Sequence, residues 1–360
     1  MRILVTGGCG FVGATICRRL VEHRAGAAVT AVDSLRRLGS ELNRQTLVDL
    51  GVRVVHADVR LASDWDGLGS FDWVVDAAAE PSVLAAAPGS RGVTSRQLIE
   101  HNLLATVNLL EAAEAWGAGV VLLSTSRVYS IPALEALSLV ERPGPDGAAF
   151  ALDVDGPLPP GATAAGLTEE FSTASPVSPY GATKLASEIL AAEHAHRRQT
   201  PVYINRCGVL AGAGQFGRAD QGIFSWWIHS WAARRPLSYI GFGGRGLQVR
   251  DCLHPDDLAA LVDRQIDVNI AGPNVCNVSG GAASATSLAE LSQWCARRFG
   301  PHPVGTVAEA RPYDARWLVL DSTRASRDFS WQPRRAAAVI FAEIADHAER
   351  HPDWLERCGG

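Results

Sequence analysis

The amino-acid sequence predicts an α/β fold in which a doubly wound parallel sheet is followed by a smaller, mixed α/β lobe. Buried apolar runs of strand length alternate with amphipathic stretches of helix length from Met1 to Asn205, which is the pattern of parallel strand–helix–strand units. A glycine-rich turn joins the first strand to the first helix. A chain of 360 residues that is 47% hydrophobic also buries enough apolar surface for two lobes rather than one.

The first strand is expected over residues 1–6, and it runs directly into the glycine-rich turn at residues 7–13. An apolar-periodic helix follows over residues 14–21. Counted from Gly8 the glycines fit the spacing G-x-G-x-x-G, and counted from Gly7 they fit G-x-x-G-x-x-G. Glycines in such a turn let backbone N–H groups approach a pyrophosphate and let the helix pack closely on the strand. We therefore expect a dinucleotide at this turn, the alternative being a glycine-rich turn without a ligand.

An acidic residue at the end of the next strand indicates which dinucleotide is bound. The strand expected over residues 28–32 ends at Asp33, which lies 20 residues past Gly13. A carboxylate at this place would bind the ribose 2′-hydroxyl and repel a 2′-phosphate, which favours NAD over NADP. Arg36 and Arg37 follow closely and are the alternative, because they could receive that phosphate. The cofactor contacts expected from the turn and this strand are Gly7, Gly10, Phe11, Val12, Gly13, Asp33 and Ser34.

Two further strands end in residues suited to cofactor binding. The strand over residues 52–56 ends near Asp58, which we expect beside the adenine. The strand over residues 72–77 runs into a series of alanines, where the backbone can pass close to the cofactor. A long amphipathic helix is expected next, over residues 97–116. The contacts expected from this part of the chain are Asp58, Val59, Ala77, Ala78, Ala79 and Asn102.

Lys184 is the only lysine among the 33 Lys and Arg positions of the chain. It lies four residues after Tyr180 in a helix expected over residues 179–196, so that both side chains share one face, and Pro179 suits the first turn. A compact ammonium beside a tyrosine hydroxyl favours the phenolate and lowers the tyrosine pKa, whereas arginine presents a wide planar fork. We expect the pair to act together, the alternative for Lys184 being an ordinary solvated surface residue.

Hydroxyl side chains end the strand that comes before this helix. The fifth strand, over residues 120–123, ends in Ser124-Thr125-Ser126, and a sixth strand is expected over residues 202–205. Ligands of doubly wound sheets bind at the carboxyl ends of the strands, so these hydroxyls are expected near the tyrosine–lysine helix. The cofactor contacts expected here are Ser124, Tyr180, Lys184 and Cys207.

Composition excludes several classes of partner and site. The net charge is −5 with no basic tract, so nucleic acid is not expected as a partner. No apolar run reaches the roughly 18 residues that span a bilayer, so no membrane association is expected. The first residues already form the cofactor strand, which argues against a removable signal peptide. The seven cysteines are odd in number and show no C-x-x-C, so we expect neither disulfides nor metal ligands but buried thiols in a reducing cytoplasm.

Residues 130–178 form a long segment rich in Pro, Gly and Ala, between Tyr129 and Pro179. Segments of this length without a clear pattern are usually functional or disordered. Because its two ends flank the expected active-site strand and helix, we interpret it as a flap that covers the site. A dispensable excursion from the fold is the alternative.

Together these features resemble the extended short-chain dehydrogenase/reductase superfamily, which contains the sugar-nucleotide epimerases and dehydratases. The resemblance covers nearly the whole chain. Besides the T-G-G-x-G-F-x-G turn and Y-x-x-x-K, three segments resemble the family's helix four, its R-D-x-x-H-x-x-D segment and its C-terminal signature. These segments are residues 102–113, residues 249–257, and residues 311–314 with Asp321 and residues 331–333.

The resemblance implies a Rossmann domain over residues 1–200, including the flap at 130–178. It also implies a substrate-binding lobe over residues 201–360, with part of 237–270 returning to the first domain. Within the superfamily, three segments are similar to the CDP-paratose (CDP-tyvelose) 2-epimerases. They are residues 124–129, residues 215–216 with 220–222, and residues 246–251.

The family's catalytic set, carried over residue by residue, is Thr125, Tyr180 and Lys184. In this assignment Tyr180 takes a proton from a sugar hydroxyl, Thr125 hydrogen-bonds that hydroxyl, and Lys184 holds the nicotinamide ribose and stabilises the phenolate. Arginines of the family meet the diphosphate of the substrate, a task suited to a fork donor. The chain departs from the family at Val209, where many relatives carry the asparagine of R-x-x-N. The substrate contacts expected are Thr125, Ser126, Tyr180, Gln215, Gln248, Arg250 and Arg311.

The residues after Thr125 discriminate between reactions of the superfamily. Sugar-nucleotide 4,6-dehydratases read Thr-Asp-Glu here, whereas Ser126 and Arg127 supply neither carboxylate. The resemblance therefore implies an NAD-dependent epimerase that acts at C2 of a CDP-linked deoxyhexose, as a homodimer or homotetramer. The alternatives are a 4-epimerase or ketoreductase of a UDP-, dTDP- or GDP-linked sugar. A non-catalytic NAD-binding sensor is a further alternative, but such proteins typically lack the Tyr/Lys pair.

Overall fold

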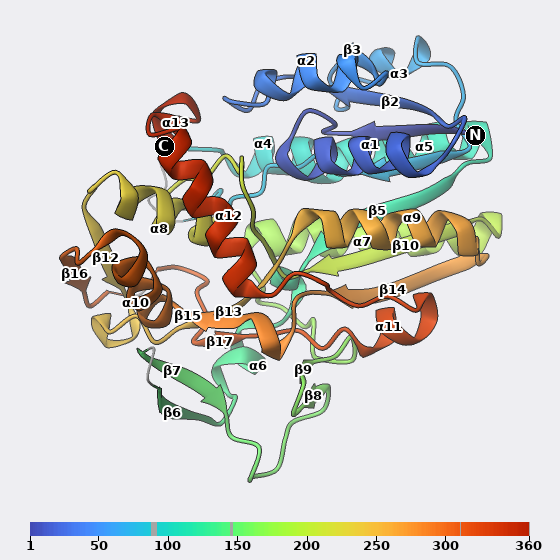
Figure 1. Ribbon diagram of the computed structural model, residues 1–360. Helices are drawn as coiled ribbons and strands as arrows, with labels where there is room; N and C mark the ends of the chain where they lie inside the picture. Colours follow the sequence, from blue (N-terminus) through green and yellow to red (C-terminus); the bar gives the residue numbers. More distant parts are fainter. Residues whose placement is uncertain (88–91, 145–146, 310, 360) are drawn as a thin grey trace.

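The computed structural model describes residues 1–87, 92–144, 147–309 and 311–359. Its centre is a seven-stranded parallel sheet with the strand order β14-β10-β5-β4-β1-β2-β3 (Figure 1). The doubly wound parallel sheet predicted from the sequence is confirmed. The strands are β1 (Arg2–Thr6), β2 (Ala28–Asp33), β3 (Arg53–His56), β4 (Trp73–Asp76), β5 (Gly119–Thr125), β10 (Pro201–Cys207) and β14 (Gly272–Val278).

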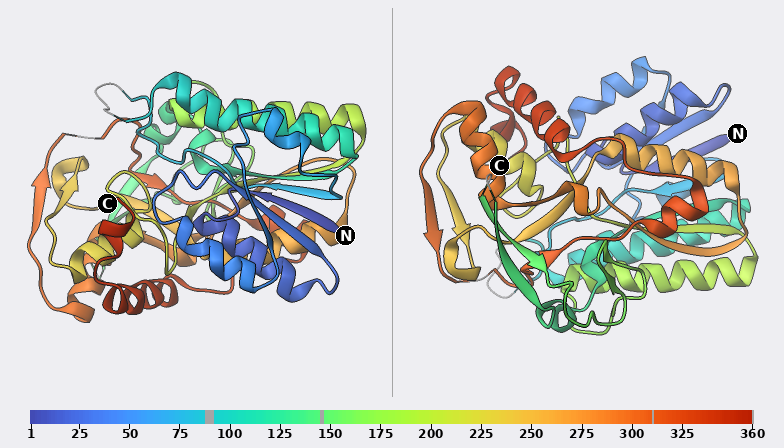
Figure 2. Two further views of the ribbon diagram at one scale, coloured as in Figure 1. Left: turned by 90° about the horizontal axis from the view of Figure 1, so that it is seen from above. Right: turned by 60° about the horizontal axis from the view of Figure 1, so that its bottom comes forward.

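Helices cover both faces of this sheet, and the two faces have separate cores. In the view from above, α5 (Ala105–Trp116) and α7 (Pro179–Arg198) lie on one side, and α1 (Phe11–His23) and α2 (Glu41–Asp49) on the other (Figure 2). Successive residues of a strand point to opposite faces, so a strand buried on both sides is apolar throughout. In β1, Ile3 belongs to the core on the α1 side and Leu4 to the core on the α5 and α7 side.

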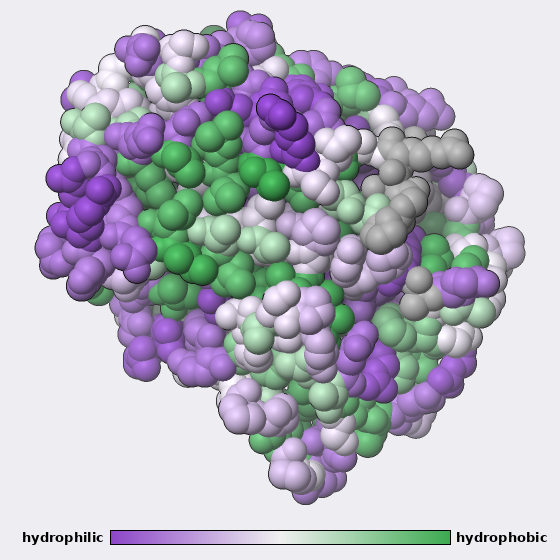
Figure 3. All heavy atoms as spheres, turned by 180° about the vertical axis from the view of Figure 1, so that it is seen from behind, coloured by the Kyte–Doolittle hydropathy of each residue, from purple (hydrophilic) through white to green (hydrophobic). Residues whose placement is uncertain are grey.

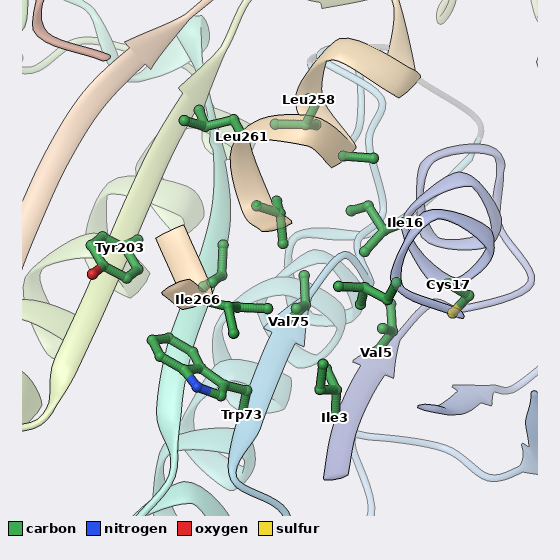
Figure 4. Close-up of a cluster of buried hydrophobic side chains, with 14 of the residues drawn as sticks. Ile3, Val5, Ile16, Cys17, Trp73, Val75, Tyr203, Leu258, Leu261 and Ile266 are labelled. Atoms are coloured by element: carbon green, nitrogen blue, oxygen red, sulfur yellow. The ribbon is translucent and has the colours of Figure 1, made fainter. Parts of the chain in front are cut away.

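The C-terminal half of the chain completes the core on the α1 side. Helix α9 (Pro255–Val268) packs against α1, and its side chains Leu261 and Ile266 belong to the same core as Val5 of β1, with Ile266 beside Trp73 and Val75 (Figure 4). Strands β10 and β14 also lie beyond residue 200 and belong to the same sheet. The chain therefore crosses the expected domain boundary at residue 200 more than once, and not only within residues 237–270.

The small lobe has mixed strand directions, as predicted. Strand β13 (Val249–Leu253) pairs in parallel with β11 (Val209–Leu210) and β17 (Trp317–Leu318), and antiparallel with β15 (Ala285–Ser287). A second, two-stranded sheet and several helices complete the lobe. They are β12 (Leu237–Ile240), β16 (Val304–Val307), α8 (Ile223–Ala232), α10 (Leu288–Phe299), α11 (Thr323–Phe329), α12 (Ala337–Arg350) and α13 (Trp354–Arg357).

Residues 130–178 do not take the place expected of a flap. Their described part contains α6 (Ile131–Glu135) and two hairpins, and it packs against the small lobe below the sheet (Figure 1). Leu134 and Leu167 share a core with Leu318, and the Phe150 amide donates to the Leu247 carbonyl over 2.9 Å. Apolar side chains inside the Pro- and Gly-rich segment therefore bury themselves against β13 and β17. The hairpins are β6 (Leu139–Gly144) with β7 (Gly147–Leu152), and β8 (Ala162–Thr163) with β9 (Gly166–Leu167).

Two findings bear on the composition of the chain. The seven cysteines are buried with free thiols. Among the described residues, none of the helices combines the length and the apolar character that a membrane crossing requires.

Candidate active site

A cavity of about 740 Å³ opens at the carboxyl ends of the sheet strands, between the sheet and the small lobe. All residues that the sequence predicts for the cofactor or the substrate line this cavity, except Asn102. The described part of residues 130–178 contributes nothing to the lining, which corrects the interpretation of this segment as a covering flap. On the cofactor side the predicted residues are Gly7, Gly10, Phe11, Val12, Gly13, Asp33, Ser34, Asp58, Val59, Ala77, Ala78, Ala79, Ser124, Lys184 and Cys207. On the substrate side they are Thr125, Ser126, Tyr180, Gln215, Gln248, Arg250 and Arg311.

The glycine-rich turn forms a cradle that leaves no room for side chains. A Cβ atom on Gly13 would lie 2.1 Å from the Gly7 carbonyl oxygen, and one on Gly7, where φ is +60°, would lie 2.8 Å from the Ala77 oxygen. Helix α1 begins directly after Gly10, and no side chain caps its N-terminus. The free N–H groups of that first turn and the positive end of the helix dipole suit a pyrophosphate. The turn therefore fits a dinucleotide.

Gly8 has a different task from the other glycines of the turn. It does not line the cavity, and a Cβ atom there would lie 2.5 Å from the Cβ of Ala31 in β2. Gly8 thus permits close packing on the neighbouring strand, while Gly7, Gly10 and Gly13 face the cavity.

Asp33 is held in place at the end of β2 by two backbone amides. Its carboxylate accepts from the Cys9 amide over 2.9 Å and from the Leu35 amide over 2.8 Å. Burial raises the pKa of Asp33, and these amides oppose the rise. Of the two arginines named as alternative phosphate ligands, Arg36 lines the cavity, whereas Arg37 is engaged with other residues. Its Nη2 donates to the Phe216 carbonyl over 2.5 Å and to the Gln221 side chain over 2.6 Å.

Asn102 supports the site from behind. It lies in a π-helical turn (Glu100–Leu104) that interrupts the long helix expected over residues 97–116. Its amide nitrogen donates to the Glu80 carbonyl over 3.2 Å and to Thr183 Oγ1 over 3.1 Å, and its oxygen accepts from the Glu80 amide over 2.8 Å. Asn102 therefore joins the loop after β4 to α7. Asn102 does not itself line the cavity, and its contact with the cofactor stays a prediction.

The tyrosine–lysine pair is buried at the start of α7. Ser178 caps the helix by accepting from the Gly181 amide over 2.9 Å, and Pro179 occupies the first turn. The side chain of Lys184 is only 2% exposed, which argues against the alternative of a solvated surface lysine. Tyr180 is 8% exposed, and burial raises its pKa to about 12, against a lowering by the hydrogen bond with Thr125.

Helix α7 approaches the 3-10 turn after β5 (Ser126–Val128) so closely that only glycine fits at the contact. A Cβ atom on Gly181 would lie 2.2 Å from the Arg127 carbonyl oxygen. This contact sets the distance between Thr125, the last residue of β5, and Tyr180. Ser124 has a different role, because its hydroxyl donates a hydrogen bond to the buried carboxylate of Glu188.

The small lobe presents amides and guanidinium groups to the other end of the cavity. The side-chain oxygens of Gln215 and Gln248 are buried without a hydrogen-bond partner, although both residues line the cavity. Buried acceptors of this kind normally find a donor, and a bound ligand can supply it. Arg250 is engaged with Asp314 and with the Ala315 carbonyl at 2.8 Å, and Arg311 donates to the Ala219 carbonyl over 2.9 Å.

Two cavity features were not foreseen from the sequence. Arg127 lines the cavity beside Tyr180, whereas its sequence motif indicated only that a carboxylate is absent. The loop at residues 215–222, here called the clasp loop, is tied to the sheet domain by Arg37 and by Ser82, which donates to Asp220 over 2.6 Å. No local sequence pattern predicts such long-range contacts.

Among the described residues, no cluster of three side chains could hold a metal ion.

A sequence model of the NAD dependent epimerase/dehydratase family matches residues 3–279. The CDP-paratose 2-epimerase of Salmonella typhi is 26% identical over 378 residues, which cover 98% of this chain and 99% of the relative. The dTDP-glucose 4,6-dehydratase of Streptomyces antibioticus is 28% identical over 367 residues, covering 99% and 95%. The crystal structure of UDP-glucuronic acid 4-epimerase from Bacillus cereus with UDP-glucuronic acid and NAD superposes with a TM-score of 0.78 at 22% identity, covering 97% of this chain and 99% of that one.

Proposed function

The chain belongs to the NAD-dependent epimerase/dehydratase family, and from this premise we propose that it inverts C2 of a CDP-linked deoxyhexose. As a member of that family it is an enzyme of nucleotide sugars that uses NAD. The observation that carries the proposal is the residue pair after Thr125. Ser126 and Arg127 line the cavity next to the catalytic set, at the place where dehydratases carry their Asp and Glu. A site without those carboxylates lacks the acid and base that the elimination of water requires.

The cofactor is held, in this proposal, by the glycine cradle and Asp33. The close approaches at Gly7 and Gly13 and the uncapped start of α1 support a pyrophosphate at this place. NAD, when bound, supplies a hydride acceptor that later returns the hydride to the same carbon. Asp33 accepts from the ribose hydroxyls, and Lys184 donates to the nicotinamide ribose.

The protein's own residues move the proton. Tyr180, as the phenolate, accepts the proton of the sugar hydroxyl while Thr125 hydrogen-bonds that hydroxyl, and Tyr180 returns the proton when the ketone is reduced. The burial of Tyr180 and Lys184 keeps water from competing for these contacts. Gln215, Gln248 and Arg311 hold the nucleotide and diphosphate, which leaves the sugar able to present either face between the two hydride transfers.

The alternative substrates are UDP-, dTDP- and GDP-linked sugars, with 4-epimerisation or ketoreduction as the reaction. A panel of CDP-, UDP-, dTDP- and GDP-sugars, with products read by NMR, tests the assignment. We expect a CDP-deoxyhexose to be inverted at C2 without added oxidant or reductant and without release of NADH. Inversion at C4, or net reduction with consumption of NADH, would replace the proposal by one of these alternatives.

An isotope experiment separates the mechanism from the identity of the substrate. With deuterium on the epimerised carbon, the label should remain on that carbon in the product, and a reaction in heavy water should introduce none there. Solvent deuterium at the inverted carbon would mean that a proton is abstracted beside a carbonyl, and hydride return would have to be abandoned.

We also propose a homodimer or homotetramer. The face opposite to that of Figure 1, on which α5 and α7 lie, shows an extended apolar region (Figures 2 and 3). Exposed apolar side chains on α7 and on the helical turns that contact it are Ile99, Leu104, Ile189 and Leu190. A contiguous apolar surface of this kind marks an interaction site. Sedimentation of the parent and of Ile189→Glu tests the proposal, and a monomeric parent would contradict it.

A further inference from the structure

Arg127 is fixed between the two residues that would handle the sugar hydroxyl. It lies in the short 3-10 turn after β5 (Ser126–Val128), and its amide donates to Thr125 Oγ1 over 3.2 Å. Its carbonyl oxygen lies against Gly181, the residue next to Tyr180. Its guanidinium lines the cavity, where its Nη1 donates to the Tyr313 carbonyl over 3.2 Å.

The charge of this guanidinium is not neutralised locally. The carboxylate that acts on it, Asp314, is paired with a second arginine, Arg250, so that one negative charge stands beside two positive ones. Within the described ranges, Arg127 forms no ion pair of its own. Burial, and next to it the charge of Arg250, lower the pKa of Arg127 to about 10, which still leaves the group charged at neutral pH. Arg127 is partly buried, and a cation withdrawn from water without an ion-pair partner is costly unless it serves another group.

The phenolate of Tyr180 is a group that such a cation would stabilise. Besides burial, the groups that act on the pKa of its hydroxyl are Thr125, which hydrogen-bonds it, Cys207 and Glu80, which disfavour the phenolate, and Arg127, which favours it. Lys184 adds a cation one turn along α7. A phenol buried at this place, with a pKa raised to about 12, accepts protons only when nearby positive charge stabilises its ionised form.

We propose that Arg127 is a positioning residue whose cation stabilises the phenolate of Tyr180 and so completes the proton acceptor of the site. The inference rests on the proposed role of Tyr180 as acid and base. It gives Arg127 a role in the reaction, beyond the absence of a carboxylate at its place. Lys184 holds the cofactor ribose and favours the phenolate from α7, and Arg127 adds its charge from the side of β5.

The test is an ultraviolet titration of Tyr180 in the NAD-saturated protein. The phenolate absorbance of each variant is measured against the same variant carrying Tyr180→Phe, so that the other four tyrosines cancel. Arg127→Gln should raise the pKa of Tyr180 by about one unit, and Arg127→Lys, which keeps the charge, should restore most of the difference. An unchanged titration in Arg127→Gln would overturn the proposal.

A matched control and a reverse test complete the experiment. Arg311→Gln removes another cavity-lining guanidinium, whose hydrogen bond goes to Ala219, and should leave the titration of Tyr180 unchanged. If Arg127→Gln fails to fold, Asp314→Asn tests the same interaction by removing a negative charge instead of a positive one. Removal of the carboxylate beside Arg127 should lower the pKa of Tyr180, and a rise or no change would contradict the proposal.

The pH dependence of the activity gives a second measurement, which would not change if Arg127 had a purely structural role. With an accepted nucleotide sugar, Arg127→Gln should lower kcat at neutral pH about tenfold and recover toward the parent rate at higher pH, since one unit of pKa corresponds to a tenfold change in phenolate. A raised KM with an unchanged pH profile would instead assign Arg127 to substrate binding. The titration needs no substrate, so inactivity toward every nucleotide sugar would refute the proposed function without touching this result.

Discussion

The Ser82 hydroxyl donates a hydrogen bond of 2.6 Å to Asp220, which joins the loop after β4 to the clasp loop 138 residues later. Arg37 holds the same loop from the side of β2, through the Phe216 carbonyl and the Gln221 side chain. The clasp loop therefore spans from the small lobe to two loops at the cofactor end of the cavity. An epimerase that recycles its NAD needs the cofactor to stay bound between turnovers, and these bonds would favour that.

Removal of one of these ties should make the protein lose NAD faster. We expect Ser82→Ala to increase the NAD dissociation rate about fivefold, because a hydrogen bond to a charged group contributes on the order of 1–2 kcal/mol when it is partly buried. Displacement of bound NAD by excess nucleotide in a stopped-flow instrument measures this rate. Ser138→Ala is the control, since that hydroxyl donates to Asp153 at an exposed site. Equal rates in parent and Ser82→Ala would exclude the clasp loop from cofactor retention.

Catalysis should depend on the chemical type of the two buried residues of α7. Tyr180→Phe removes the proton acceptor and should lower turnover by about a hundredfold or more if proton transfer limits the rate. Lys184→Arg keeps the charge but replaces a point donor by a fork, and should fold yet lose activity. Circular dichroism and thermal unfolding serve as controls of folding. Near-normal turnover in both variants would show that the catalytic assignment is wrong.

Cofactor preference should follow Asp33. The unmodified protein should bind NAD at least about tenfold more tightly than NADP, roughly 1.4 kcal/mol, because a carboxylate repels the 2′-phosphate. Asp33→Ala should narrow this ratio in calorimetric titrations. Arg36→Ala tests the alternative, because Arg36 also lines the cavity; if Asp33 sets the preference, this variant should leave the ratio unchanged. Equal affinity for the two cofactors in the parent would contradict this role of Asp33.

The contact between α7 and the 3-10 turn after β5 should not tolerate a methyl group. Gly181→Ala places a Cβ atom 2.2 Å from the Arg127 carbonyl oxygen and must move the helix, so we expect a loss of about 2–3 kcal/mol in the free energy of unfolding. Activity should fall with it, because the distance between Thr125 and Tyr180 changes. Gly67→Ala, where nothing lies within 4 Å, should stay within about 0.5 kcal/mol in urea titrations. If Gly181→Ala had the stability and activity of the parent, the helix could shift at this contact at little cost in free energy.

Stability should fall in mild acid because of a buried histidine pair in the small lobe. His229 and His347 lie 3.1 Å apart between ring nitrogens, and burial lowers the pKa of both, that of His347 to about 3 from 6.5. The unfolded chain then binds more protons than the native protein, so the stabilisation is present above pH 6.5 and is lost as the pH falls from there toward 3. Urea titrations at several pH values should show this slope, and His347→Gln should reduce it. The exposed His196→Gln is the control, and an equal slope in His347→Gln would contradict the prediction.

Local patterns were sufficient for the parts of the site that lie within one strand–turn–helix unit. The glycine turn, Asp33 and the tyrosine–lysine pair could be placed because strand ends of a parallel sheet meet at one edge. The tie between Ser82 and Asp220 depends on two distant segments, and neither residue has a motif of its own. Residues 130–178 were misplaced for a related reason. Their Pro and Gly content concealed apolar side chains such as Leu134 and Leu167, and the surface that receives them comes from β13 and β17.

The position of β14 at one edge of the sheet has a consequence for synthesis. Because β10, β14 and α9 all come from beyond residue 200, a nascent chain that has released only its first half leaves the α1 side of β1 and β4 only partly covered. The part of the core around Ile3, Val5 and Val75 that α9 contributes is added only after residue 268 has left the ribosome. The nucleotide-binding half therefore cannot mature on its own during translation. A gene fragment that stops near residue 200 should yield an aggregating product rather than a minimal NAD-binding protein.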